Sequence, residues 1–120
     1  MPQLVAAPTL IPVPGGKIIK EYAGRVTTGT TEMSLAHMVA PGGWEEPAQT
    51  PEFDEWTLVL RGTVRVEHDG GFLDVQAGQA VLTKAGETVR YTTPDAEGAE
   101  YVAVCLPAFG PELAHRADEA

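Results

Sequence analysis

Residues 64–75 read VRVEHDGGFLDV and form the clearest local pattern in the chain. Apolar and polar side chains alternate on both sides of Asp69-Gly70, and this period of two is typical of a half-buried strand. An Asp-Gly pair between two such runs favours a tight turn whose backbone twist matches that of the strands. We therefore predict a β-hairpin over residues 64–75.

Short apolar runs bounded by turn residues continue on both sides of this hairpin. The 13 Gly and 10 Pro among the 120 residues exceed their combined average share of about 12%. Only residues 111–117 look helical, and that segment is too short to contribute to the core. Many short strands in a chain of one-domain length predict an all-β sandwich or barrel. The runs are residues 33–39, 56–60, 80–82, 88–91 and 101–106.

The chain divides into three parts: an extended N-terminal arm over residues 1–16, a barrel over residues 17–110 and a short C-terminal tail over residues 111–120. The arm is apolar and proline-rich without a strand or helix period, so it needs a surface on which to dock. We expect that surface to come from a second subunit, which predicts a homodimer. The arm contains no Lys or Arg, and three prolines interrupt its apolar stretch, so we expect neither a signal peptide nor a transmembrane helix.

Net charge and cysteine content indicate which kinds of binding partner and which cellular compartment to expect. Eight Lys and Arg against 17 Asp and Glu give a net charge of −9, which repels phosphate backbones and anionic membrane surfaces. We therefore expect a small-molecule ligand, with neither nucleic acid nor membrane as a partner. The single cysteine, Cys105, cannot form an internal disulfide, which favours a cytoplasmic protein.

Two glycine frames surround the hairpin at fixed spacings. The first runs through Gly43, Gln49, Pro51, Glu55 and Gly62, and after 15 residues the second runs through Gly78, Lys84-Ala85-Gly86, Val89 and Thr93. These spacings resemble the two motifs of the cupin superfamily. The resemblance covers residues 43–93 and implies a double-stranded β-helix (jelly-roll) barrel.

The resemblance also implies where a metal would bind. In cupins, two histidines and a glutamate of the first motif and one histidine of the second ligate the metal, whereas the corresponding residues here are Gln49, Pro51, Glu55 and Val89. Proline and valine side chains offer no lone pair to a metal, so we expect no tightly bound metal and no other cofactor. A weaker alternative is a nonstandard divalent-ion site formed by Glu55, Gln49 and His37, with Glu46 as a further ligand.

Glu55 is the main candidate for chemistry. The resemblance implies that its side chain points into the barrel, and strand alternation then places Thr57 and Val59 on the same face and Trp56 on the other. A carboxylate among apolar walls has a raised pKa, which suits a general acid or base. The alternative is that Glu55 only accepts a hydrogen bond from Gln49 or a tyrosine.

His37 is the second catalytic candidate. It shares strand parity with Leu35 and Val39, which predicts that it points inward and faces Glu55. A histidine and a carboxylate in one lumen form a proton-transfer pair. The alternative is a core histidine bound to a backbone carbonyl.

Five residues are candidates for substrate binding. The Gln49 amide both donates and accepts hydrogen bonds, and Tyr91 has the inward parity of Val89. The face to which Tyr101 and Cys105 belong is not determined by the pattern, and Cys105 fits a buried apolar position better than a nucleophile. We expect His68 and His115 to be solvated. The substrate-binding candidates are Gln49, Tyr91, Thr57, Trp44 and Tyr101.

Three functions remain open at this point. The first is an enzyme of isomerase, lyase or cyclase type that uses Glu55 and His37 without a standard metal. The second is a cupin that binds a small ligand without turnover, and the third is a metal-dependent oxygenase with a nonstandard site. The unneutralised carboxylate of Glu55 favours the first.

Overall fold

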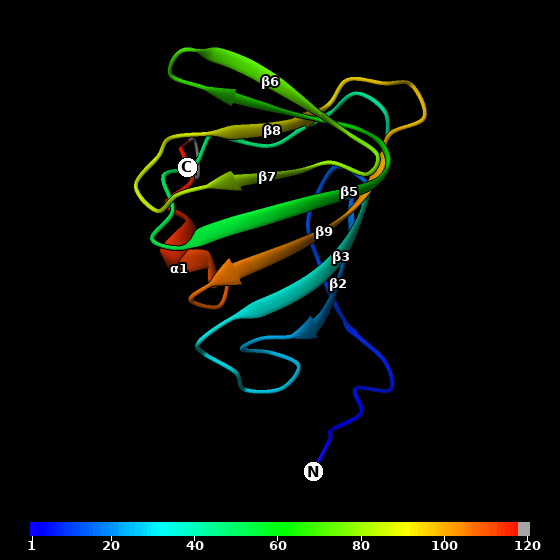
Figure 1. The fold of residues 1–120 in the computed structure, drawn as a ribbon, viewed down its shortest axis with the longest axis vertical. Helices are drawn as coiled ribbons and strands as arrows, with labels where there is room; N and C mark the ends of the chain where they lie inside the picture. The colour runs from blue at the N-terminus through cyan, green and yellow to red at the C-terminus, as the bar shows by residue number, and fades with distance from the viewer. Residues whose placement is uncertain (118–120) are drawn as a thin grey trace.

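Nine strands and one short helix are present in the computed structural model, which describes residues 1–117 (Figure 1). This confirms the expected all-β class. The strands are β1 (Thr9–Ile11), β2 (Ile18–Ala23), β3 (Ser34–Ala40), β4 (Trp44–Glu45), β5 (Asp54–His68), β6 (Gly71–Gln76), β7 (Ala80–Thr83), β8 (Arg90–Thr93) and β9 (Ala99–Leu106), and the helix is α1 (Pro111–Ala114).

The long strand β5 joins the two halves of a curled antiparallel sheet (Figure 1). Its first half pairs with β7 and β9, and its second half pairs with β6 and β8. Strands β3, β2 and β1 extend the first half beyond β9, and β4 extends the second half beyond β8. The result is the jelly-roll half-barrel that the cupin resemblance implied.

The predicted hairpin is confirmed as the pair β5–β6. Val64 pairs with Val75 and His68 pairs with Gly71, which places the turn at Asp69 and Gly70. Alternation and turn chemistry are both local signals, and for this reason the hairpin could be predicted from a short stretch of sequence.

Gly62 marks the point at which β5 passes from one half of the sheet to the other. Its φ is +78°, and a Cβ built there would lie 2.1 Å from the carbonyl oxygen of Gly98. A side chain therefore conflicts with both the backbone conformation and the neighbouring chain. This explains physically why the first motif ends in glycine.

The alternation predicted along β5 is also confirmed. Glu55, Thr57 and Val59 are buried, whereas Trp56 and Leu58 are 47% and 43% exposed. Of these three inward residues, Val59 belongs to a buried apolar core to which β3, β4, β6, β8 and β9 also contribute. Its buried members are Ala40, Trp44, Val59, Val64, Val66, Val75, Val89, Tyr91, Ala99 and Tyr101.

The two ends of the chain differ in how they pack. Residues 9–11 of the arm form β1 on the edge of β2, whereas residues 1–7 are exposed and lead away from the sheet (Figure 1). At the other end, Ala114 of α1 is fully buried against Phe53 and Cys105. The expectation that the tail does not contribute to the core was therefore wrong. Within residues 1–117, no helix has the length and hydropathy needed to cross a membrane.

Candidate functional site

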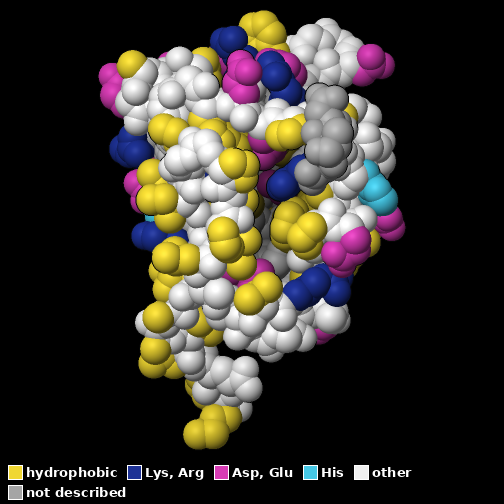
Figure 2. Space-filling view, turned by 180° about the vertical axis from the view of Figure 1, so that it is seen from behind, with side chains coloured by type: hydrophobic (Ala, Val, Ile, Leu, Met, Phe, Trp, Pro, Cys, Tyr) yellow, Lys and Arg dark blue, Asp and Glu magenta, His cyan; other side chains and the backbone are white. Residues whose placement is uncertain are grey.

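A cavity opens inside the curled sheet and contains about 670 Å³ of empty space, including the part that opens to solvent. In Figure 2 a hollow runs down the middle of one face, where acidic and basic side chains are visible below a hydrophobic rim. Its lining, mostly apolar with a few charged and polar side chains, is of the kind that binds small molecules. Its lining residues come from the arm, from strands β2, β3, β5, β8 and β9, and from the C-terminal tail.

Glu55 lies in this cavity, as the sequence predicted. It is 9% exposed, and burial and neighbouring charges, rather than hydrogen bonds, determine its ionisation. Burial and the negative charge of Glu46 raise its pKa, the positive charges of Lys17 and Arg116 lower it, and the resulting pKa is about 7. Glu55 can therefore both take up and release a proton near neutral pH.

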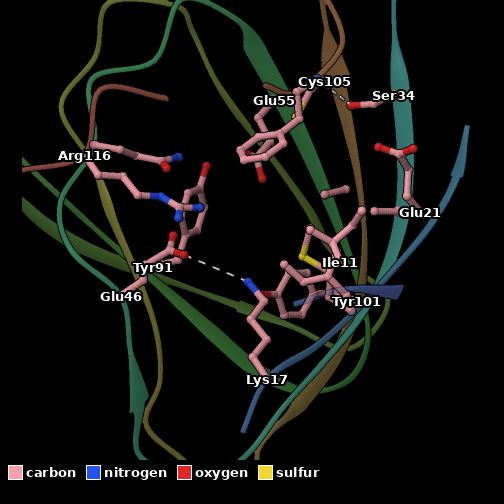
Figure 3. A pocket seen from close by; sticks show the side chains of 16 residues that line it. Ile11, Lys17, Glu21, Ser34, Glu46, Glu55, Tyr91, Tyr101, Cys105 and Arg116 are labelled. Carbon is pink, nitrogen blue, oxygen red and sulfur yellow. Dashed lines mark hydrogen bonds and ion pairs between the residues drawn. The ribbon is translucent and has the colours of Figure 1, made fainter. Parts of the chain in front are cut away.

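Lys17 and Glu46 form an ion pair in the same cavity (Figure 3). The Lys17 Nζ atom lies 3.9 Å from Glu46 Oε2, and the two side chains are 6% and 11% exposed. The ammonium also lies 4.1 Å from the centre of the Trp44 ring. Burial lowers the pKa of Lys17 and raises that of Glu46, while the attraction between the two charges opposes both shifts.

Arg116 reaches the cavity from the C-terminal tail, shortly after α1. Its backbone forms an isolated bridge with Gln49, and its side chain lines the cavity, as does that of Tyr91 (Figure 3). Its Nε atom is buried and has no hydrogen-bond partner among residues 1–117. The cavity thus contains a guanidinium group with a donor left for a ligand.

Neither Lys17 nor Arg116 was expected at the site, because both lie outside the cupin motifs. One signal was available for Lys17, which alternates with Ile19 and Glu21 and so shares their inward face. No comparable signal marks Arg116, since a short tail has no strand period. Glu46 was expected only as an extra metal ligand.

Three of the predicted substrate-binding residues line the cavity: Gln49, Tyr91 and Tyr101. The hydroxyl groups of Tyr91 and Thr83 are hydrogen-bonded at 2.8 Å, and burial raises the pKa of both tyrosines, so they remain protonated at neutral pH. The structure thus places all three at the cavity, including Tyr101, whose face the sequence pattern left open, and their role in binding remains a prediction.

The other two predicted binding residues lie behind the cavity wall. Trp44 packs in the core against Lys17, and Thr57 is fully buried with a hydroxyl group that has no hydrogen-bond partner in the described part of the chain. Cys105 lines the cavity as a buried free thiol whose pKa is raised by burial, which makes it a poor nucleophile at neutral pH.

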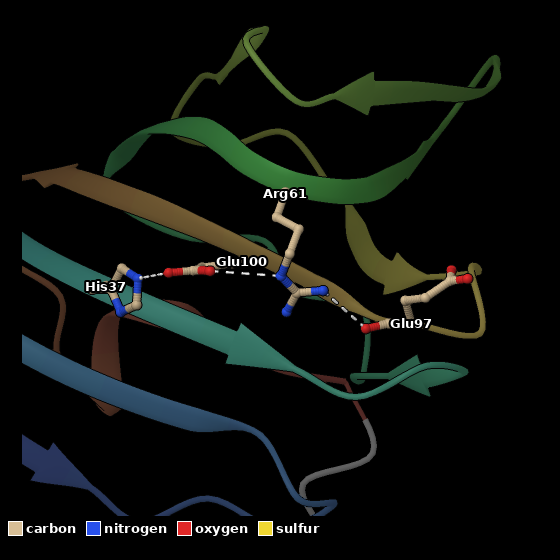
Figure 4. Close-up of polar contacts among 4 residues, drawn as sticks. All are labelled: His37, Arg61, Glu97 and Glu100. Atoms are coloured by element: carbon tan, nitrogen blue, oxygen red, sulfur yellow. Dashed lines mark hydrogen bonds and ion pairs between the residues drawn. The ribbon is translucent and has the colours of Figure 1, made fainter.

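The inward placement of His37 was wrong. Ala36 and Met38 line the cavity, so His37 points to the outer face of the sheet. There its Nε2 atom lies 2.6 Å from Glu100 Oε2, and Arg61 approaches the other oxygen of the same carboxylate at 3.6 Å (Figure 4). Because β3 carries apolar residues on both faces, its pattern did not distinguish the inner face from the outer one.

The remaining histidines are exposed, as expected. His68 lies at the end of the hairpin, and His115 pairs with Glu52 on the surface. The acidic residues between positions 45 and 54 do not converge on one point, because Asp54 accepts a hydrogen bond from the Ala85 amide and Glu45 faces Arg90. Glu46 is the member of that group that enters the cavity with Glu55.

The sequence from residue 36 to residue 105 matches the family described as the cupin domain. The chain belongs to the cupin family. This match covers more than half of the 120 residues and includes the whole of both motifs.

Individual relatives support the same fold. The chain is 45% identical over 106 residues to a protein of Myxococcus xanthus named endoribonuclease YbeY, covering 88% of this chain and 36% of that protein. Oxalate decarboxylase from Bacillus subtilis superposes with a TM-score of 0.77 at 18% identity, covering 93% of this chain and 30% of that one. The polyketide cyclase RemF from Streptomyces resistomycificus superposes with a TM-score of 0.71 at 16% identity, covering 88% and 79% of the two chains. The chain thus spans only about a third of the length of the first two proteins.

The side chains at the cupin metal positions do not fit a metal. Of Gln49, Pro51, Glu55 and Val89, only Glu55 offers a carboxylate and only Gln49 an amide oxygen. The nonstandard site also fails, because His37 lies on the outer face. Across residues 1–117, no three His, Cys, Asp or Glu side chains are grouped in a way that could hold a metal ion. We therefore derive no chemical step through a metal.

Proposed function

We propose that this cupin converts a small molecule by general acid–base chemistry at Glu55, as an isomerase, lyase or cyclase that needs no metal. The observation that carries the proposal is the Glu55 carboxylate, which lies in the cavity with a pKa of about 7. A group that titrates near neutral pH is suited to both halves of a proton transfer. His37 has no part in this proposal, because it lies on the opposite face of the sheet.

Neighbouring side chains support such a reaction. The ionised Glu55 would remove a proton from a carbon next to a carbonyl group and return it to another atom of the same molecule. The negative charge that develops on the carbonyl oxygen would be stabilised by the Lys17 ammonium and the Arg116 guanidinium. Gln49 and Tyr91 offer neutral hydrogen-bonding groups that would hold the substrate in position.

The relatives support the coarse part of this proposal. Oxalate decarboxylase and polyketide cyclase are names of enzymes that act on small molecules, and both share this fold. The name of the Myxococcus relative supports no RNA chemistry here, because this chain covers 36% of that protein and carries a net charge of −9 that repels RNA. The free thiol of Cys105 is consistent with a cytoplasmic location, which we also propose.

The test begins with a thermal-shift screen of metabolites, followed by turnover assays on the compounds that bind. Glu55→Gln should lower turnover by roughly 10²-fold or more while retaining affinity, because the amide keeps the shape but transfers no proton. Glu97→Gln, on the exposed loop before β9, is the control and should retain full activity. Unchanged turnover in Glu55→Gln would exclude the catalytic role. If no bound compound is converted and Glu55→Gln loses affinity, the protein is a non-catalytic binding cupin.

A further inference from the structure

We propose that the ligand of this cavity is a small monocarboxylate with an apolar body, and that Arg116 binds its carboxylate group. The inference names the substrate class of the site proposed above. It rests on the same cavity but not on catalysis by Glu55.

Arg116 differs from the arginines of the sheet in lacking an acidic partner. Arg61, Arg65 and Arg90 approach carboxylates of the same chain at 3.6, 2.8 and 3.0 Å, on the outside of the barrel. Among the described residues, no carboxylate lies within 4.0 Å of the Arg116 guanidinium, and its buried Nε atom has no acceptor. An unmet buried donor is costly, and a planar guanidinium matches a carboxylate with two parallel hydrogen bonds.

The other charged groups of the cavity, apart from Glu55, already have partners within the chain. Lys17 and Glu46 compensate each other. The Glu21 carboxylate accepts hydrogen bonds from the backbone amide and the hydroxyl group of Thr27, both at 2.7 Å, and so is directed away from Arg116. The two tyrosines and Cys105 are neutral, because burial raises their pKa values.

Glu55 and Arg116 then determine the charge that a ligand meets. When Glu55 is protonated, Arg116 has no ionised carboxylate close to it among the described residues, because Glu46 pairs with Lys17 and Glu21 is held by Thr27, and the carboxylate of a ligand can take that place. The negative ligand in turn favours the protonated form of Glu55, so that ligand binding and proton uptake by Glu55 are linked. A ligand bound this way meets protonated Glu55, so the exchange proposed above would begin with Glu55 donating its proton to the ligand, and the carboxylate that results would then remove the proton from the carbon next to the carbonyl group.

The rest of the cavity surface indicates what the remainder of the ligand is like. Ile11, Ile19, Met38 and Phe109 contribute apolar side chains to the lining. Such walls favour a hydrocarbon or aromatic body over a sugar, because each hydroxyl group buried without a partner costs free energy.

The experiment compares small aliphatic and aromatic monocarboxylates with their primary amides, which have nearly the same shape. Affinities are measured at pH 6 by ligand-observed NMR and calorimetry on the full chain. We expect the acids to bind at least about 10-fold more tightly than the amides, the lower end of the range for a charged hydrogen bond. Arg116→Gln should abolish this preference, and Arg116→Lys, which keeps the charge but not the planar fork, should retain part of it. Arg65→Gln, on the outer surface, is the matched control and should keep the full preference.

Acids that bind no better than amides, or that do not bind at all, would overturn the proposal. The proposal would also be overturned if the folded Arg116→Gln protein still bound acids as preferentially as the unchanged protein does. Thermal unfolding of each variant separates loss of binding from loss of folding, and Arg116→Lys remains informative if Arg116→Gln does not fold. Because the readout is binding, a catalytically inactive protein can still support this inference. Conversely, if acids bind no better than amides, the turnover test of Glu55 can still be carried out, because it does not depend on this preference.

Discussion

Gln49 and Val89 are backbone partners, with the N–H group of each donating to the carbonyl oxygen of the other at 2.8 and 2.9 Å. Residues that exchange both hydrogen bonds in an antiparallel pair direct their side chains to the same face. Gln49 lines the cavity, so position 89 faces it as well. The cupin resemblance implies a metal-binding histidine at both positions.

This pairing predicts that a metal site can be restored. Gln49→His combined with Val89→His adds two imidazoles to the carboxylate of Glu55, which makes three ligands on one face. We expect the double variant to bind about one equivalent of Ni²⁺ or Zn²⁺, measured by calorimetry and elemental analysis. Adding Glu55→Gln should weaken the binding. If the double variant takes up no more metal than the unchanged protein, this would contradict the placement of positions 49 and 89 on one face with Glu55.

The raised pKa of Glu55 predicts a pH-dependent stability. The folded protein keeps this carboxyl group protonated up to about pH 7, whereas the unfolded chain loses the proton near the ordinary value of 4.5. The folded state therefore binds more protons between these values, and its stability falls as the pH rises through that interval and levels off above pH 7. At about 1.4 kcal/mol for each pKa unit, the loss is on the order of 3 kcal/mol.

Glu55→Gln isolates this contribution, because other groups titrate over the same range in both proteins. We expect the variant to be close to the unchanged protein at pH 5 and more stable than it at pH 8, as measured by urea denaturation. Glu97→Gln should follow the unchanged protein at both pH values. A stability difference for Glu55→Gln that does not vary with pH would show that the carboxyl group is ionised throughout.

The fold was predictable because its signals are local. Alternation on β5 and the Asp69-Gly70 turn determine the hairpin, and Gly62 is required where β5 changes sheets. The site was predictable only in part. Glu55 lies within a motif, whereas the orientation of His37 depends on a strand with two apolar faces and Arg116 enters from an aperiodic tail. Neither of these can be read from the local pattern, because each is determined by long-range packing.

Thr57 offers a test of a buried polar group. Its side chain is fully buried, and its hydroxyl group has no hydrogen-bond partner within residues 1–117. Thr57→Val keeps the shape and removes the unmet group, so we expect the free energy of unfolding to rise by about 1 kcal/mol. Thr83→Val, which breaks the hydrogen bond to Tyr91, should instead lower it. A destabilised Thr57→Val protein would show that the hydroxyl group has a partner, such as a bound water or a ligand.

The homodimer remains a prediction, and the structure suggests a second surface for it besides the arm. Trp56, Leu58 and Leu60 of β5 and Leu106 of β9 are all 43–48% exposed on the outer face of the sheet. Exposed apolar side chains on adjacent strands are typical of interfaces. We expect light scattering to give the mass of two chains at tens of micromolar, the range in which interfaces of ordinary size form.

Trp56→Glu should shift this dimer to monomer. Phe72→Glu, which changes an exposed aromatic residue on the other half of the sheet, should not. Removal of residues 1–8 tests separately whether the arm contributes to the dimer. A monomeric mass for the unchanged protein would refute the homodimer altogether.

The positive charge of Lys17 acts on two carboxyl groups of the cavity. It lies 3.9 Å from Glu46, and it is one of two cations that lower the pKa of Glu55. Lys17→Met leaves the Glu46 charge buried without its partner, and breaking a buried pair in this way costs about 3 kcal/mol or more. We expect this loss to grow as the pH rises, because the variant must then bury carboxylate charge without the lysine, and to be smaller near pH 5. The pKa of Glu55 should rise above its value of about 7 in the same variant, so the decline in stability should extend to higher pH.

Two further lysine variants separate the charge from its position. Lys17→Arg restores a cation at the same place and should recover most of the stability that Lys17→Met loses. Lys20→Met removes a cation from the outer face of β2, three residues further along the chain, and should leave the dependence of stability on pH unchanged. Urea denaturation between pH 5 and 8 gives the free energy of unfolding of each variant. If it depends on pH in the same way in Lys17→Met and Lys20→Met, the Lys17–Glu46 ion pair does not determine the ionisation of the cavity carboxyl groups.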